Sequence, residues 1–121
     1  MATSTLKSFD NPIVAMHSLG TTYTYVVLAN GRIYRHAISG NAITLLGRVR
    51  GDVKCVVADG TTATYLYLGM GDGRVIKFTT ADGTDSEITR VNSAIKGMAL
   101  ASTNIWVACA DGELKLTTTT G

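Results

Sequence analysis

The stretch Tyr67-Leu-Gly-Met-Gly-Asp-Gly-Arg-Val-Ile76 decides how the chain is expected to fold, because it recurs with variation. Related stretches are Tyr25-Val-Val-Leu-Ala-Asn-Gly-Arg-Ile-Tyr34 and Trp106-Val-Ala-Cys-Ala-Asp-Gly-Glu-Leu-Lys115. In each copy an Asn-Gly or Asp-Gly pair separates two apolar runs, which is the strongest short-range signal for a β-hairpin. Such a turn predicts positive φ at both residues of the pair. The copies are 42 and 39 residues apart, measured between their shared glycines Gly31, Gly73 and Gly112.

A second block precedes each hairpin and has the pattern of a short strand, a turn and another strand. Its copies are Leu6–Met16, Leu46–Val56 and Ile88–Met98, in which Phe9, Val49 and Val91 are equivalent. The repeat therefore contains four short strands, and no segment shows a helical period. In the second repeat we expect them near 53–58, 64–71, 74–80 and 86–91. The chain is predicted to be one domain, 1–121, with repeats at about 10–50, 51–91 and 92–116 and an N-terminal strand at 5–9.

The strands do not alternate between apolar and polar residues, as the run Val26-Val-Leu-Ala29 shows. A sheet with one wet face would show that alternation, so these sheets are expected to be covered on both faces. An aromatic residue that opens the second strand and an Asp-Gly turn that leads to the third resemble the blade pattern of β-propellers. The resemblance covers about residues 5–116 and lacks the Gly-His and Trp-Asp dipeptides of WD repeats. It implies a fold and leaves the function open.

The repeats are not cut at blade boundaries. Thr5–Phe9 matches a fourth strand, whereas Glu113–Thr117 matches a third strand without a fourth. Propellers have about four to eight blades, so we expect two chains to form one six-bladed ring. In that homodimer the N-terminal strand of one chain completes the last blade of the other. The residues expected to close the ring are Thr5, Leu6, Lys7, Ser8, Phe9, Leu114 and Leu116.

Two other threefold all-β folds stay open as alternatives. A β-trefoil, the second choice, also has three repeats of four strands at this length, and so does a β-prism. The chain contains neither the Gln-x-Trp of trefoil lectins nor the Gln-x-Asp-x-Asn-x-Val-x-Tyr of prism lectins.

Composition indicates a folded domain: the 121 residues are 45% hydrophobic and 17% charged. The net charge of +2 makes nucleic acid an unexpected partner. No signal peptide or transmembrane segment is visible, so we expect cytoplasmic synthesis and no membrane, with the final location open and a virion included. Cys55 and Cys109 are expected to be two small buried thiols, with a disulfide as the alternative.

No catalytic or metal-binding constellation stands out. His17 and His36 have no Cys, Asp or Glu at a ligand spacing. The acidic stretch Asp82–Glu87 fits no EF-hand and is expected to be a solvated loop. We therefore predict no enzyme, no metal and no cofactor.

Several aligned side chains are candidates for binding. Tyr25, Tyr67 and Trp106 could stack on sugars between blades, or could only pack there. Tyr23 and Tyr65 form a second aligned pair that could face a ligand at the rim. Lys54 and Lys96 are expected on innermost strands, where they could line a channel that takes an anion. Recurring arginines could form positive circles, although charges on outer strands also serve solubility. These arginines include Arg32, Arg48, Arg74 and Arg90.

The combined profile predicts a non-enzymatic, self-assembling propeller module with a structural or interaction role. Abundant Thr, Gly and Ala resemble the composition of small bacteriophage virion proteins, such as tail, collar or capsid-decorating subunits. A lectin-like sugar binder and an adaptor that docks another protein are the alternatives. The expected partners are a second copy of the chain, virion or cellular proteins, and glycans in the lectin case.

Overall fold

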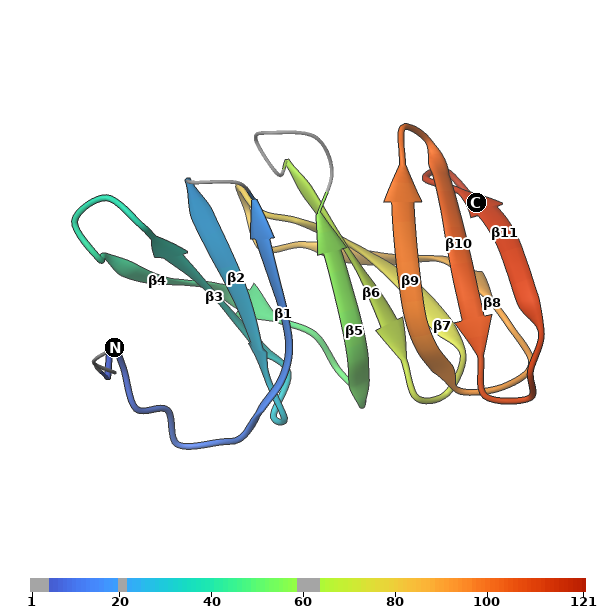
Figure 1. Ribbon diagram of the computed structural model, residues 1–121, viewed down its shortest axis with the longest axis horizontal. Coiled ribbons are helices and arrows are strands. Elements are labelled where there is room, and N and C mark those ends of the chain that lie inside the picture. The colour runs from blue at the N-terminus through green and yellow to red at the C-terminus, as the bar shows by residue number, and fades with distance from the viewer. Residues whose placement is uncertain (1–4, 20–21, 59–63) are drawn as a thin grey trace, which may run out of the picture.

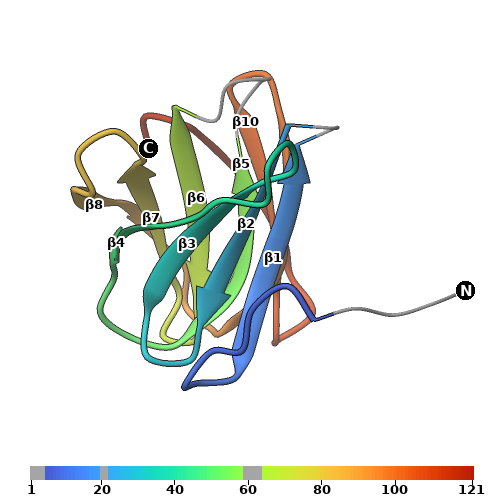
Figure 2. The same cartoon turned by 90° about the vertical axis from the view of Figure 1, so that its left-hand side faces the viewer.

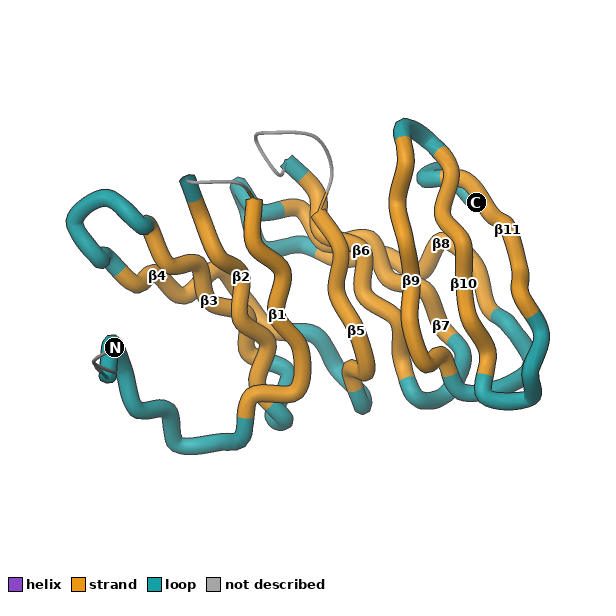
Figure 3. The backbone as a smooth tube through the Cα atoms, in the orientation of Figure 1, coloured by secondary structure: helices purple, strands orange, loops and turns teal. Residues whose placement is uncertain are grey.

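The computed structural model describes residues 5–19, 22–58 and 64–121, and these form three antiparallel sheets side by side (Figure 1). Every regular element that Figure 3 draws in them is a strand. The strands are β1 (Ile13–Leu19), β2 (Tyr23–Leu28), β3 (Arg32–Ala37), β4 (Ile43–Arg48), β5 (Val53–Ala58), β6 (Tyr65–Met70), β7 (Arg74–Thr79), β8 (Asp85–Arg90), β9 (Ile95–Ala101), β10 (Asn104–Cys109) and β11 (Leu114–Thr118). Within the described ranges, no helix has the length and apolar character needed to cross a membrane.

The sheets follow the order of the chain. Blade 1 consists of β1 to β4, blade 2 of β5 to β8, and blade 3 of β9 to β11, each with its strands in sequential order. The first strands of the three blades are neighbours in order: β5 contacts β1 of blade 1 and β9 of blade 3. The prediction of an all-β fold with four-stranded repeats is confirmed for two blades. The strands of blade 2 begin and end within one residue of the ranges expected for the second repeat. The third blade has three strands, as the register of the repeats predicts.

The hairpin turns differ from the expected conformation. Gly31, Gly73 and Gly112 have φ of 89°, 94° and 90°, whereas the preceding Asn or Asp is not among the described residues with positive φ. In the second turn, the Gly73 amide donates to the Met70 carbonyl at 3.1 Å, and the Arg74 amide donates to the Asp72 carboxylate at 3.2 Å. The expectation of positive φ at both residues was therefore wrong, because the loop is one residue longer than a two-residue turn.

Strand pairing sorts the side chains of each blade onto two faces. In blade 1, Tyr25 lies opposite His17 and Arg35, and Val26 lies opposite Met16 and Tyr34. Directly opposite residues share a face, so these two rows are on opposite sides of the sheet. We call the side of a blade that contains the Tyr25 row, or its equivalent, the rear face, and the opposite side the front face.

The core lies between blades. The rear face of blade 1 and the front face of blade 2 enclose Val27, Ile33, Leu68 and Phe78, all fully buried. The rear face of blade 2 and the front face of blade 3 form a second cluster around Tyr67. Cys55 and Cys109 are free thiols and form no disulfide; the buried-thiol prediction holds for Cys109, whereas Cys55 is only half-buried. Burial raises the pKa of the Cys55 thiol, against a hydrogen bond with the Gly69 backbone.

The predicted N-terminal strand is not formed in this single chain. Residues 5–9 are irregular and lie over the front face of blade 1, the side seen in Figure 2. The Phe9 ring packs on Tyr34 with centroids 4.8 Å apart. A strand needs a partner edge, and the front face of a sheet offers side chains instead of backbone groups.

Replacing Gly73 by Ala is expected to destabilise the fold by about 3 kcal/mol. Its φ is unfavourable for Ala, and a methyl group there would collide with the Val91 carbonyl oxygen. Gly112→Ala meets no atom within 4 Å, so φ strain alone should cost about 1 kcal/mol. Urea denaturation of dilute protein measures both, and equal losses would contradict this account.

Candidate functional site: two unpartnered blade faces

The rear face of blade 3 has no neighbouring blade. Trp106 lies opposite Ala99 and Leu116, and Leu114 lies opposite Ala108. Leu114 is 72% exposed and Leu116 is 61% exposed, whereas Trp106 is only half-buried. Apolar side chains thus cover a sheet face that nothing among the described residues packs against.

The same positions are buried in the other two blades. Tyr25 and Tyr67, which are equivalent to Trp106, are 1% and 2% exposed. Ile33 and Val75, which are equivalent to Leu114, are each 0% exposed. The following blade covers them in both cases, so the exposure of blade 3 comes from the missing neighbour.

The front face of blade 1 is the second face without a neighbouring blade, although residues 5–9 lie over part of it. Ile13 is 50% exposed and Met16 is 59% exposed. Their equivalents in blade 2, Val53 and Val56, are 2% and 5% exposed because blade 1 covers them. The two open faces lie at opposite ends of the row of sheets (Figure 1). Inside the chain, the rear face of one blade packs against the front face of the next blade. The two open faces, one rear and one front, are therefore of complementary types.

The aligned aromatic residues have different environments. Tyr25 and Tyr67 are enclosed between blades, where they pack, and a sugar does not reach their rings in this arrangement. The Arg35 guanidinium lies 4.7 Å from the centroid of the Tyr23 ring, and the Lys77 ammonium lies 4.0 Å from that of Tyr65. Such cation–π contacts hold these tyrosines in place. A role of Tyr23, Tyr65 or Trp106 in binding stays a prediction.

Lys54 and Lys96, which were expected to line a channel, are both exposed and differ in their pairing. Lys54 on β5 pairs with Asp52, with 3.0 Å between the ammonium nitrogen and a carboxylate oxygen. Lys96 on β9 is exposed. Among the described residues there is no group of three or more metal-ligating side chains. An anion site at these lysines stays a prediction.

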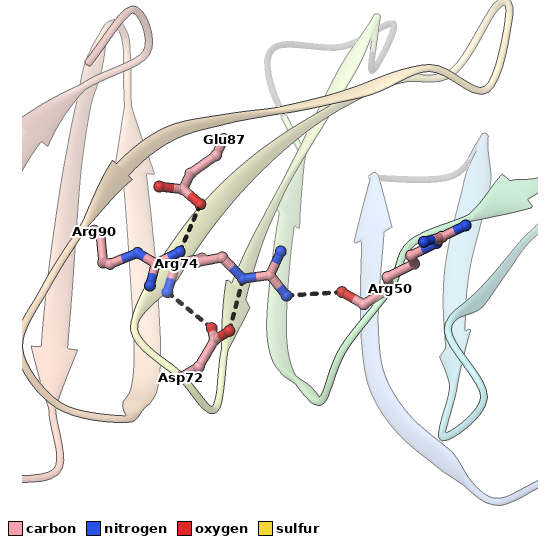
Figure 4. A network of polar contacts seen from close by, with 5 residues as sticks. All are labelled: Arg50, Asp72, Arg74, Glu87 and Arg90. Carbon is pink, nitrogen blue, oxygen red and sulfur yellow. Dashed lines mark hydrogen bonds and ion pairs between the residues drawn. The ribbon is translucent and has the colours of Figure 1, made fainter.

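Among the recurring arginines, Arg74 stabilises a turn and a blade junction, and Arg90 pairs within β8 (Figure 4). Arg74 donates from Nε to Asp72 at 2.7 Å and from Nη2 to the Arg50 carbonyl at 2.8 Å, which joins blade 2 to the segment after β4. Arg90 donates to Glu87 at 3.0 Å. Slight burial acts to raise the pKa of Asp72. Hydrogen bonds from Arg74 and the charges of Arg74 and Arg90 nevertheless hold this pKa below its usual value. These contacts give both arginines a structural role.

The similarity to known proteins concerns the fold. No family model matches the chain, and no curated protein matches its sequence. The chain is similar to the computationally designed Ika4 protein, at 18% identity and a TM-score of 0.79, over 99% of this chain and 75% of that one. It is also similar to the WD40 β-propeller domain of Doa1, at 12% identity and a TM-score of 0.80, over 97% and 40%.

A chain of the mitotic checkpoint complex is similar at 10% identity and a TM-score of 0.66, over 96% of this chain and 40% of that one. Together with the blade topology, these likenesses confirm the propeller-type fold over the trefoil and the prism. The chain spans two fifths of the Doa1 domain and three quarters of Ika4.

Stability should fall as the pH drops below about 6.5, because burial lowers the pKa of His17 beneath that usual value. The unfolded state then binds the proton more tightly than the folded state. His17→Gln should reduce the difference in unfolding free energy between pH 7.5 and pH 5.5, measured by urea denaturation. An unchanged difference would show that other groups cause the pH dependence.

Proposed function

We propose that the chain is a non-enzymatic structural and interaction module that assembles with a second copy into a six-bladed ring. The rear face of blade 3 carries this proposal, because Leu114 is 72% exposed where its equivalents Ile33 and Val75 are 0% exposed. A front face of a fourth blade would bury it. Blade 1 of another copy offers such a face, with Ile13 and Met16 exposed.

The number of copies follows from the number of blades. One chain supplies three blades, which is fewer than the four to eight of typical propellers. Two copies give six blades and three give nine, so two copies fall within the range. The contact is heterologous, since a rear face meets a front face, and it closes when each chain spans half of the circle.

The interaction role in this proposal is supported by the propeller-type fold. The likeness to a chain of the mitotic checkpoint complex supports an interaction role by analogy of fold alone. The bacteriophage virion role, the sugar-binding alternative and the adaptor alternative stay predictions from the sequence.

Leu114→Glu is expected to abolish the dimer and leave the monomer folded. The side chain is exposed in the single chain but would be enclosed in the ring, where an unpaired carboxylate costs several kcal/mol. A penalty of about 3 kcal/mol weakens association by more than 100-fold. Light scattering after size exclusion should change from about twice 12.8 kDa to 12.8 kDa.

Leu45→Glu is the matched control. Leu45 is 52% exposed, and the equivalent residue of blade 2 is Glu87, which is exposed even between two blades. This variant should therefore keep the mass of the unsubstituted protein. A monomeric unsubstituted chain would overturn the proposal, and so would a Leu114→Glu variant that remains dimeric.

A further inference from the structure

Residues 5–9 occupy the surface that a second copy would need. Phe9 packs on Tyr34, and the segment borders an open hollow of about 490 Å³ over the front face of blade 1. Leu6, Phe9, Met16, Ile38 and Ile43 are among the residues that line it. Ile76, the equivalent of Tyr34 in blade 2, is 4% exposed because blade 1 rests on it. The segment and a docked blade therefore compete for one face.

The turn at Gly112 offers the segment another place. In blade 1 the Val49 amide donates to the Gly31 carbonyl at 3.0 Å, and in blade 2 the Val91 amide donates to the Gly73 carbonyl at 2.8 Å. The backbone of Val49 or Val91 thereby fills the space beside each glycine. A methyl group on Gly112 would meet no atom within 4 Å, although the φ of Gly112, 90°, is close to those of Gly31 and Gly73.

Phe9 is the residue whose backbone fits this space. It lies four residues before β1, as Val49 and Val91 lie four residues before β5 and β9. A backbone hydrogen bond just before the first strand of the blade is also repeated. The Pro12 carbonyl accepts from the Ala29 amide at 2.8 Å, and the Asp52 carbonyl accepts from the Gly71 amide at 2.7 Å. Only the residues before Pro12 have to change direction for Phe9 to reach the Gly112 of an adjacent copy.

We propose that residues 5–9 have two docking places: the front face of their own blade 1 in the free chain, and the β11 edge with the Gly112 turn of a second copy in the ring. The inference rests on the proposed ring and names the contact that completes it. Phe9 donates its amide hydrogen to the partner's Gly112 carbonyl, and Ser8 lies opposite the partner's Glu113. The exchange uncovers the front face and completes blade 3 with a fourth strand.

The pairing of Ser8 with Glu113 can be trapped by a disulfide. It corresponds to the pairs Arg32 with Arg48 and Arg74 with Arg90. Beside the Phe9–Gly112 hydrogen bond, Ser8 and Glu113 form a non-hydrogen-bonded pair, whose Cα atoms are about 4.5 Å apart, a distance that a disulfide spans. Full-length Ser8→Cys and Glu113→Cys chains are mixed at dimer-forming concentration and oxidised mildly. We expect a covalent heterodimer.

A mixture of the Ser39→Cys and Glu113→Cys chains is the control, because Ser39 is an exposed loop residue outside the proposed contact. It should give only the background of the native thiols. If sedimentation shows dimers while the Ser8 mixture stays at this background, strand exchange is overturned and the ring stands. If the unsubstituted chain is monomeric, both proposals fail.

Gly112→Ala tests the same contact without cysteine. The methyl group is free of contacts in the single chain but would meet the partner's Phe9 backbone in the ring. We expect the dimer dissociation constant to rise at least tenfold. Gly40→Ala introduces a similar φ strain, at 84°, again with no atom within 4 Å, and should leave association unchanged. Equal association of both variants would overturn the Gly112 contact.

Discussion

Each sheet of this protein is apolar on both faces, and the rest of the structure depends on this constraint. Tyr67 and Leu68 are adjacent in β6 and point to opposite faces, yet they are 2% and 0% exposed. Burying one such side chain contributes about 2 kcal/mol, so a blade gains stability from a neighbour on each of its two faces. Three blades in a row satisfy this demand at two junctions and leave one face at each end without a neighbouring blade. The turn network of Figure 4 positions the strands but does not remove that demand.

Much of the fold could be predicted because its signals are local. The Asp72-Gly73 pair between apolar runs located a hairpin, and the lack of alternation indicated sheets covered on both faces. The turn conformation was not predictable in this way. Two-residue and three-residue hairpin loops share the same dipeptide, and the bond from the Arg74 amide to the Asp72 carboxylate stabilises the longer form.

The candidate site could be predicted only in part, because it depends on which blades are neighbours. Tyr25, Tyr67 and Trp106 are equivalent in the sequence, but only Trp106 lies on a face without a neighbour. Leu114 was expected to help close the ring. The burial of its equivalent Val75 shows that a following blade covers this position. Residues 5–9 carry the pattern of a strand, but backbone pairing requires an edge, and their own blade already has its fourth strand.

The spacing of the turn glycines has a consequence for protein engineering. Nine residues follow Gly112 and Gly31 is the thirty-first residue, so two copies fused end to end would place these glycines 40 residues apart. That interval lies between the 39 and 42 residues within the chain. A tandem polypeptide without any added linker would keep the period of the repeats. One such molecule would carry six blades, and its closure would no longer depend on protein concentration.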